Sequence, residues 1–521
     1  MPLSIPDIVP IRSLIKSSLY KDSVALMRIA EDVQTAARNT RVTLLMGTPA
    51  NKEILAEAKL LAGELANAGP ADLMVIVEAA SDAECERALQ TVEAKLTPAA
   101  PSAGHGAGDT AIPLRSIGMA LGHGKARIAQ ISVPGPYAAA EAMKALKAGM
   151  HAFVFSDNVP IEQEVALKKL AQQKGLLVMG PDCGTAIIAG VPLGFANIVR
   201  RGAIGLVAAS GTGLQEVSTQ IHRLGEGISH AIGTGGRDVS ESVGGITMLA
   251  ALDALGADPA TRVLVVIAKP PSARVTRSVL DKLETLGKPA VVLFIGAKLE
   301  TSGQTHAVST LYEAAATAVG LSRGRNAAPI SNDASAVAAI ARTLHPDQRF
   351  IRALYSGGTY CSEAQSIWRA SNISAYSNAP LKKEYALADP RMSIEHTALD
   401  LGDDTFTVGK PHPMIDPTTR IERIANEARD RQTALILLDV VLGYGSHPDP
   451  AGALAPAISQ ALATAKGAGR TLPIITFVCG TEEDPQSRSR QETTLRNAGA
   501  IVLPSSTAAA RMAGAIIESR R

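Results

Sequence analysis

The stretch that decides the fold reads GPDCGTAIIAGVPLGFANIVRRGAIGLVAASGTGLQEVSTQIHRLGEGISHAIGTGGR and spans Gly180 to Arg237. Within it, an apolar run at 204–209 predicts a buried strand, and the spacing of apolar residues at 214–224 predicts a helix. A glycine-containing turn between a strand and a helix leaves backbone N–H groups free, and the helix dipole favours an anion there. The stretch therefore predicts a phosphate or carboxylate site on an α/β fold. Its candidate ligand-binding residues are Ser210, Gly211, Thr212 and Gly213.

The overall composition argues against several classes of protein. A chain of 521 residues is too long for one core. The net charge of +2 comes from mixed signs and only 3% of the residues are aromatic, which argues against nucleic acid as a partner. The four cysteines are far apart without metal-binding spacing, so we expect a reducing compartment and no metal site. No signal peptide and no membrane-spanning run are recognisable, which predicts a soluble cytoplasmic protein.

Strands and helices alternate through the first 200 residues. Five apolar runs predict strands, at 41–46, 72–77, 128–133, 152–156 and 176–179. Alternation of this kind predicts a parallel, doubly wound sheet, which binds ligands beyond the carboxyl ends of its strands. The predicted rim consists of Gly47, Thr48, Asn51, Lys52, Val133, Pro134, Ser156, Asn158, Gly180, Pro181 and Asp182.

The chain after residue 201 divides into two units that look alike. In the first, a strand leads into the turn at 210–213 and then into a helix. In the second, a strand at 350–355 leads into Ser356, Gly357, Gly358 and Thr359 and then into a helix. Two copies of one α/β module, packed pseudo-symmetrically, are the economical interpretation. The paired turns would then face one cleft.

Several segments carry a family resemblance. IGLVAASGTGLQEVSTQI, HAIGTGGRDVSESVGG and LLVMGPDCGTAIIAGVPL resemble the α-subunit of succinyl-CoA synthetase, and SVPGPYAAAEAMKALKAGMHAFVFSDNVP resembles the CoA-binding domain of that subunit. DLGDD and LLDVVLGYG resemble the carboxy-terminal domain of the β-subunit. Through MGTPANK, GPDCGT, ASGTG, GGRD, KPP, LGDDTFTVGKPHPMIDPT and GTEEDPQSRSRQ, nearly the full length is very similar to the FdrA family.

This resemblance implies both a fold and a function. The implied fold is α/β, with a Rossmann-like CoA-binding-type domain followed by two flavodoxin-like ligase modules of the succinyl-CoA synthetase type. The domains expected are an N-terminal segment at 1–100, the rest of the Rossmann domain at 101–200, and modules at 201–328 and 345–521, with a linker or mobile loop at 97–109. FdrA proteins are labelled acyl-CoA synthetase. Those encoded with allantoin-degradation genes are linked to oxamate carbamoyltransferase, which interconverts oxalurate with oxamate and carbamoyl phosphate.

The chain departs from the synthetases at the residues that carry phosphate. No segment matches an ATP-grasp domain, and the nearest equivalent of the phosphohistidine is His306, whose flank lacks the glycine-rich loop. Lys269-Pro270-Pro271 replaces the carboxylate that would support a phosphohistidine, and the sequence at 47–52 replaces the usual CoA loop. We therefore favour a surface helix position for His306 over a role in phosphoryl transfer.

Three charged or polar residues are candidates for catalysis. Arg237 follows a glycine-rich turn where a guanidinium can bind a carboxylate or phosphate, although a surface ion pair with Asp238 is the alternative. Lys269 ends an apolar strand, where an anionic partner is expected. His412, in a proline-braced loop, could act as a general acid or oxyanion donor, or the loop could be structural. Further ligand-binding candidates are Gly235, Gly236 and Lys410.

Two residues have a structural interpretation instead. Asp439 lies inside an apolar strand and is expected to cap a neighbouring turn. Cys183 is expected to be a buried thiol, because no histidine lies near it in sequence.

Three hypotheses for function remain open. The first is an enzyme subunit that handles a small acyl or carbamoyl phosphate, with oxalurate or oxamate and phosphate or carbamoyl phosphate as the implied substrates. The second is an acyl-CoA synthetase that binds CoA on residues 41–198 and needs a separate ATP-grasp subunit. The third is a non-catalytic scaffold in a larger complex. We expect an oligomer with other enzyme subunits, and Mg²⁺ could bind through a phosphate.

Overall fold

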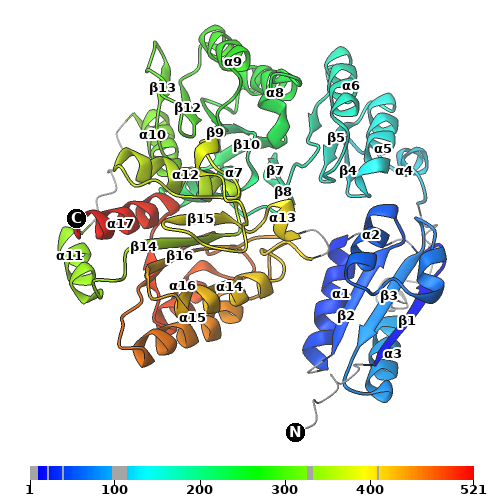
Figure 1. Cartoon of the computed structure of the whole chain (residues 1–521). Helices are drawn as coiled ribbons and strands as arrows, with labels where there is room; N and C mark the ends of the chain where they lie inside the picture. Colours follow the sequence, from blue (N-terminus) through cyan, green and yellow to red (C-terminus); the bar gives the residue numbers. More distant parts are fainter. Residues whose placement is uncertain are drawn as a thin grey trace. The chain divides into compact units, whose positions relative to one another are not determined.

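The computed structural model describes residues 10–19, 21, 23–37, 40–96, 114–324, 333–407 and 410–521, and the chain forms two compact units (Figure 1). The N-terminal unit comprises Met1–Pro113 with Val408–Pro411. The larger unit comprises Leu114–Thr407 with His412–Arg521. The predicted linker at 97–109 lies outside the described residues.

The N-terminal unit is built on a three-stranded antiparallel sheet in the order β1-β3-β2. The central strand, β3, alternates: Leu73, Val75 and Val77 pack into one apolar cluster with the helices α1 and α3, while Met74 and Ile76 pack into a second cluster on the other face. Alternation of this kind lets one strand support two layers. The elements are β1 Ile11–Lys16, α1 Ser23–Ala36, β2 Arg41–Met46, α2 Pro49–Glu57, the 3-10 helix Gly63–Asn67, β3 Leu73–Glu78 and α3 Asp82–Leu96.

This arrangement corrects one prediction. The strands at 41–46 and 73–78 do not continue the parallel sheet of residues 128–179 but pair antiparallel within the N-terminal unit. The predicted single rim is therefore wrong, because Gly47, Thr48, Asn51 and Lys52 belong to a different unit from its other members. Periodicity locates strands, but it does not reveal which strands pair or in which direction.

The larger unit begins with a small parallel sheet in the order β4-β5-β6. An antiparallel hairpin, β7–β8, follows and extends the edge of the next sheet through β10. The sequence interpretation missed this hairpin, whose turn residues Ala189 and Gly190 both have positive φ. The elements are α4 Ile117–His123, β4 Ile128–Ile131, α5 Gly135–Lys147, β5 His151–Val154, α6 Ile161–Gln173, β6 Val178–Met179, β7 Thr185–Ile188 and β8 Val191–Gly194.

The first module completes a seven-stranded sheet, of which its own strands follow the order β13-β12-β11-β9-β10. Strands β9 to β13 are parallel to their neighbours within the module. The elements are β9 Arg201–Ala208, α7 Gly211–Arg223, β10 Ile228–Gly233, the 3-10 helix Gly236–Val239, α8 Ile246–Ala257, β11 Val263–Ala268, α9 Ala273–Leu286, β12 Ala290–Phe294, β13 Thr305–Ala307 and α10 Leu311–Arg323.

The second module repeats this topology, in the order β18-β17-β16-β14-β15. The match of strand order confirms the predicted duplication. The elements, after α11 Ala334–Thr343, are β14 Phe350–Tyr355, α12 Gly358–Ala370, the 3-10 helix Lys383–Tyr385, β15 Thr397–Asp400, α13 Asp404–Thr407, α14 Thr418–Arg429, β16 Thr433–Val441, α15 Pro450–Gly467, β17 Ile474–Cys479, α16 Arg488–Asn497, β18 Ile501–Leu503 and α17 Ser506–Glu518.

The two modules share one core. A single apolar cluster contains residues of both central sheets and of the helices α7, α10, α12 and α17, which lie between the sheets (Figure 1). Helices α8 and α9 cover the outer face of the first sheet, and α14 and α15 cover the outer face of the second. This sandwich fixes the two strand-to-helix turns, at the starts of α7 and α12, relative to each other.

Candidate functional site

The first predicted turn begins α7 with a side-chain cap. The hydroxyl of Ser210 accepts a hydrogen bond from the backbone N–H of Gly213 at 3.0 Å. Serine at this position satisfies one of the N–H groups that a helix leaves without an internal partner. The turn therefore has the conformation that the sequence predicted, a strand leading directly into a capped helix.

The second turn lies against the first. A β-carbon on Gly357 would lie 2.6 Å from Cγ2 of Thr212, so this close packing requires glycine. The hydroxyl of Ser210 also hydrogen-bonds the hydroxyl of Thr359, across the boundary between the modules. Duplication thus brings together two helix N-termini that are 149 residues apart in the chain.

Backbone donors remain free at this contact. In the part of the chain that the structure describes, no hydrogen bond reaches the N–H groups of Gly211, Thr212, Gly358 or Thr359. Two helix dipoles with free N–H groups that converge on one place favour a bound anion more than either alone. We refer to residues 210–213 and 356–359 together as the paired turns.

Lys269 and Asp400 come to the second of the paired turns from different modules. Lys269 follows β11, is exposed, and places Nζ 3.3 Å from the position of a β-carbon on Gly358. Asp400 ends β15, and the same β-carbon would overlap its Oδ2. Burial raises the pKa of Asp400 to about 6, while Lys269 acts in the opposite direction. The sequence interpretation included Lys269 but missed Asp400 as a site residue, although Asp400 begins the DLGDD segment that carries the resemblance to the β-subunit.

A buried ion pair between Asp439 and Arg420 supports the second of the paired turns. Asp439 accepts hydrogen bonds from the backbone N–H of Ser356 at 2.9 Å and from its hydroxyl at 2.6 Å. Arg420 on α14 pairs with Asp439 at 2.9 Å. All three side chains are buried. The prediction that Asp439 caps a turn is confirmed, and Ser356 has a supporting position because its hydroxyl is already engaged.

His412 lies beside the second turn but is held by its own loop. Its Nε2 lies 2.5 Å from the position of a β-carbon on Gly402, and its Nδ1 accepts from the backbone N–H of Met414. The ring packs at 6.0 Å from that of Phe195. Burial lowers the pKa of His412 to about 4, so the imidazole is neutral near neutral pH. A neutral ring can donate one hydrogen bond but cannot supply a positive charge.

Arg237 contacts α6 and the residues just before it rather than the paired turns. Its guanidinium donates to the carbonyl oxygen of Val159 at 2.7 Å and lies 2.9 Å from the carboxylate of Glu164 on α6. The alternative ion pair between Arg237 and Asp238 is wrong. Asp238 is fully buried, pairs with Lys168 at 2.8 Å and accepts from the backbone N–H groups at the start of α8.

At the rim beyond β5 and β6, polar groups of the predicted residues hydrogen-bond one another. The Ser156 hydroxyl donates to the carbonyl of Val133, and the backbone N–H of Asp182 donates to the carbonyl of Ser156. Gly235 and Pro181 lie so close that a β-carbon on Gly235 would overlap the carbonyl of Pro181. The remaining predicted members, Pro134, Asn158 and Gly180, carry no charge, and neither does Gly236, which was predicted separately as a ligand-binding residue.

One predicted member of this rim, Asp182, is acidic. Burial raises the pKa of Asp182 to about 6, and the charges of Asp157 and Asp404 raise it further against the effect of Arg237. Negative charge there acts against the phosphates of CoA. CoA binding at this rim stays a prediction.

The other predicted residues occupy scattered places. In the N-terminal unit, Thr48 caps α2, Asn51 donates to the carbonyl of Met46 and Lys52 donates to that of Ala66. Gly47 is packed against the backbone of Gly69. Lys410 is exposed and belongs to this unit, whereas His412 belongs to the larger one.

Two other predictions concern single residues. His306 is not on a helix, because it lies in β13 and pairs with Val291. Cys183 is a buried thiol as predicted, and burial raises its pKa to about 12.

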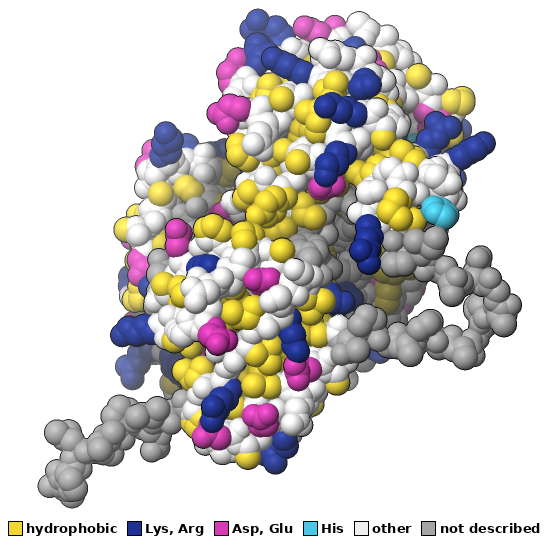
Figure 2. All heavy atoms as spheres, turned by 90° about the vertical axis from the view of Figure 1, so that its right-hand side faces the viewer, with side chains coloured by type: hydrophobic (Ala, Val, Ile, Leu, Met, Phe, Trp, Pro, Cys, Tyr) yellow, Lys and Arg dark blue, Asp and Glu magenta, His cyan; other side chains and the backbone are white. Residues whose placement is uncertain are grey.

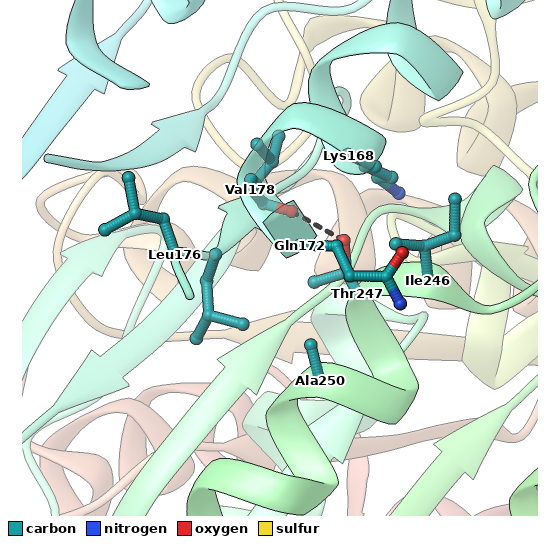
Figure 3. Close-up of a pocket in the computed structure, with 9 residues that line it drawn as sticks. Lys168, Gln172, Leu176, Val178, Ile246, Thr247 and Ala250 are labelled. Atoms are coloured by element: carbon teal, nitrogen blue, oxygen red, sulfur yellow. Dashed lines mark hydrogen bonds between the residues drawn. The ribbon is translucent and has the colours of Figure 1, made fainter. Parts of the chain in front are cut away.

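A crevice between α6 and α8 does not offer a site. Lys168, Gln172, Leu176, Ile246 and Ala250 surround it, and the Thr247 hydroxyl donates to the carbonyl of Val178 at 2.8 Å across it (Figure 3). The side chains leave no room there for a molecule the size of water. On the face drawn in Figure 2, basic and acidic side chains are interspersed without a continuous field of one sign. In the described parts of the chain, every helix is too short or too polar to cross a membrane.

Family models match three parts of the chain. The model described as "CoA binding domain" matches residues 200–296, in the first module, and the model described as "CoA-ligase" matches 354–516, in the second. The model described as "AllF, heavy metal-associated domain" matches 9–112. The fold and these matches define an α/β protein that contains a CoA-binding domain and a CoA-ligase domain.

The particular family follows from a relative that matches nearly the whole chain. The chain belongs to the family of Escherichia coli (strain K12) YahF, an uncharacterized protein, to which it is 43% identical over 503 residues, 95% of this chain and 96% of YahF. The Aquifex aeolicus protein "Succinate--CoA ligase [ADP-forming] subunit alpha" is 32% identical over 143 residues, 26% of this chain. The chain thus spans 46% of the length of that subunit.

Two solved structures match the chain at a low level of similarity. "Ca. Korarchaeum cryptofilum dinucleotide forming Acetyl-coenzyme A synthetase 1 in complex with phosphate and ADP" is 16% identical, with a TM-score of 0.28 over 76% of this chain and 83% of that one. The "ATP citrate lyase from Methanothrix soehngenii in complex with citrate and coenzyme A" is 21% identical, with a TM-score of 0.31 over 42% of this chain and 38% of that one. Scores this low do not establish a common arrangement of domains.

The described residues of the domain that matches the heavy metal-associated model hold no evident metal site. Among its described residues, no three His, Cys, Asp or Glu side chains lie close enough to hold an ion. Its cysteine, Cys85, is buried on α3, where the thiol donates to the carbonyls of Pro10 and Val77. Metal-binding thiols need access and a partner ligand, and Cys85 has neither in the described residues.

Proposed function

We propose that this chain is a subunit of an acyl-CoA-ligase-type enzyme and that the paired turns bind a phosphate or carboxylate group of its substrate. The observation that carries the proposal is the contact of two helix N-termini from two modules, with free N–H groups and Lys269 beside them. Backbone N–H groups of this kind stabilise an anion, or the oxyanion of a tetrahedral intermediate, through fixed partial charges. The succinate–CoA ligase relatives support the ligase-type chemistry.

A second candidate is carbamoyl transfer, in which oxalurate and phosphate give oxamate and carbamoyl phosphate, as the FdrA resemblance implies. Two observations favour it. His306 is on an edge strand rather than in a glycine-rich loop, and the negative charge around Asp182 acts against a polyanionic cofactor. Transfer of a carbamoyl group between an amide and a phosphate needs chiefly the positioning of two anions and an oxyanion site. Lys269 would bind one anion, and the free N–H groups of the paired turns would bind the other.

The anion site can be tested by binding. Gly357→Ala inserts a methyl group against Thr212 and pushes the paired turns apart, so we expect inorganic phosphate to bind at least tenfold more weakly, a loss of about 1.4 kcal/mol or more. Gly467→Ala, at the end of α15, is the matched control, because a β-carbon there meets open space. Titration calorimetry measures both variants. Unchanged phosphate binding by a folded Gly357→Ala protein would contradict the proposed site.

The reaction type is tested separately. The purified chain, with and without its partner subunits, is incubated with an acyl-CoA, ADP and phosphate in one assay and with oxalurate and phosphate in another. Cleavage of the thioester supports the ligase, and phosphate-dependent cleavage of oxalurate supports carbamoyl transfer. Phosphate binding without either reaction would support the scaffold.

A further inference from the structure

The second of the paired turns differs from the first because the chain supplies its own anion there. The Asp400 carboxylate contacts Gly358, the first residue of α12, which has to be glycine to accommodate it. At the first turn, the groups closest to Gly211 and Gly213 are uncharged: the hydroxyls of Thr185 and Ser210 and the methyl groups of Thr359 and Ile267. Only one of the two helix N-termini therefore faces a carboxylate.

Asp400 is held firmly, but one of its oxygens is free. Its Oδ1 accepts from the N–H of Gly402 at 3.1 Å, and its backbone N–H donates to Asn378 at 3.0 Å. Among the described residues no hydrogen bond reaches Oδ2, the atom that lies against Gly358. The charge of Lys269, whose Nζ lies near the same β-carbon position on Gly358, lowers the pKa of Asp400. The free oxygen is thus an acceptor beside the place where a bound anion would lie.

A carboxylate in this position sets a chemical condition on the ligand. Two like charges in a partly buried site repel strongly, whereas a carboxylate accepts a hydrogen bond readily. A ligand group that brings a proton to Oδ2 meets this condition, and a fully ionised group does not.

We propose that Asp400 is a specificity-determining residue at the paired turns. It admits an anion that carries a hydrogen-bond donor, such as a carboxylate beside a primary amide or a protonated phosphate. It excludes a fully ionised anion unless Asp400 itself takes up a proton. This inference rests on the proposed anion site and deepens it by naming the class of ligand.

The charged and titratable groups around Asp400 define the pH range of the test. They are Lys269 after β11, Asp403 before α13, Asp439 on β16, Cys361 on α12, and His412 beside Gly402. His412 has its pKa lowered to about 4 and Cys361 has its pKa raised to about 12, so neither changes charge between about pH 6 and pH 8. Asp439 is paired with Arg420. The pKa of Asp400, about 6, lies at the edge of this range, and that of Glu363, farther along α12, is raised to about 7. The Asp400→Asn variant therefore assigns the proton that is linked to binding.

Inorganic sulfate is a suitable probe because it stays a dianion across this range. With the natural protein, we expect sulfate affinity to fall by up to about tenfold per pH unit above the pKa of Asp400. Asp400→Asn keeps an acceptor for Gly402 and removes the charge, so its sulfate affinity should be high and nearly independent of pH. Asp389→Asn is the matched control. It removes an exposed carboxylate charge of the same module, at a side chain that accepts from the backbone N–H of Arg391, and should keep the pH dependence of the natural protein.

A matched pair of ligands gives a second readout at about pH 8, where Asp400 is ionised. Succinamate and succinate differ by one amide in place of one carboxylate. The natural protein should prefer succinamate by about tenfold, the discrimination expected from one charge-assisted hydrogen bond, and Asp400→Asn should lose the preference.

The outcomes separate this inference from the proposed function. Sulfate binding that is independent of pH in the natural protein, or unchanged pH dependence in a folded Asp400→Asn variant, would overturn the inference and leave the anion site standing. If neither the natural protein nor any variant binds sulfate or phosphate between about pH 6 and pH 8, both the inference about Asp400 and the proposed anion site are overturned. A circular-dichroism melting curve establishes that each variant is folded.

Discussion

The two modules have the same strand order, yet they support their helix N-termini in different ways. In the first, α7 begins with a serine cap and lies on β11, whose sequence VLVVIA is wholly apolar. In the second, α12 has no side-chain cap, and its turn lies on Asp439 of β16. A duplicated fold can therefore keep its geometry while one copy replaces apolar packing by a buried ion pair.

A second comparison concerns the carboxylates between the modules. Glu216 on α7 accepts from the N–H of Ser506 at the start of α17, at 3.2 Å, and Glu363 on α12 accepts from the N–H of Leu311 at the start of α10, at 2.8 Å. Each module thus caps a helix of the other. The interface between the modules therefore contains specific polar contacts in addition to the shared apolar core.

The largest expected effect comes from the ion pair that is unique to the second module. Arg420→Met leaves Asp439 buried without its cation, which should cost about 3–5 kcal/mol in the free energy of unfolding. The double variant Arg420→Met with Asp439→Leu removes both charges and should recover most of that loss. Chemical denaturation monitored by circular dichroism compares the three proteins. Equal losses in the single and double variants would show that packing, not charge, supports the second turn.

The next effect concerns the reciprocal caps and depends on pH. Burial raises the pKa of Glu363 from 4.5 to about 7 in the folded protein. The folded state therefore holds this proton more tightly than the unfolded state, so the stability that it contributes is present below about pH 4.5 and is lost as the pH rises to about 7, by on the order of 2 kcal/mol. Glu363→Gln should flatten this decline in the melting temperature.

Glu313, a half-buried carboxylate that pairs with Arg511 across the interface between the modules, is the control for that measurement. Glu313→Gln should leave the decline between about pH 4.5 and pH 7 in place. If both variants decline as the natural protein does, Glu363 is ionised in the folded state and the assignment is wrong.

The smallest effect separates a helix cap from an anion site. Ser210→Ala and Ser272→Ala each remove a serine cap, from α7 and α9, and each should cost about 1 kcal/mol. Of these two serines, only Ser210 belongs to the paired turns, where its hydroxyl contacts that of Thr359. Ser210→Ala alone should therefore weaken phosphate binding severalfold in calorimetry. A similar loss of phosphate affinity in Ser272→Ala would mean that general destabilisation accounts for it.

Most of the fold could be predicted because its signals are local. The strands β2 and β14 have the predicted bounds, and α7 begins at the predicted turn. The N-terminal unit could not be predicted in the same way, because alternation of strands and helices is compatible with both parallel and antiparallel pairing. The hairpin β7–β8 was missed for a related reason: its strands are four residues each, too short for a periodicity to stand out.

The candidate site was predictable only in part. The glycine-rich turns and Lys269 stand at the ends of apolar runs and were visible in the sequence. The partners of Arg237 were not, since Glu164 lies 73 positions away on α6 and looks like an ordinary exposed helix residue. The polar residues of α7, including Gln215 and Thr219, are buried because a second module covers them.

The α/β alternation, the duplicated module and the two glycine-rich turns follow from the amino-acid sequence. Each depends on residues close together in the chain, whose spacing sets the backbone conformation. The contact between the turns, the position of Asp400 at one of them and the ion pair of Arg237 with Glu164 are visible only in the folded chain. These features depend on how separate elements pack, and packing brings together side chains whose distance in sequence carries no signal of their contact.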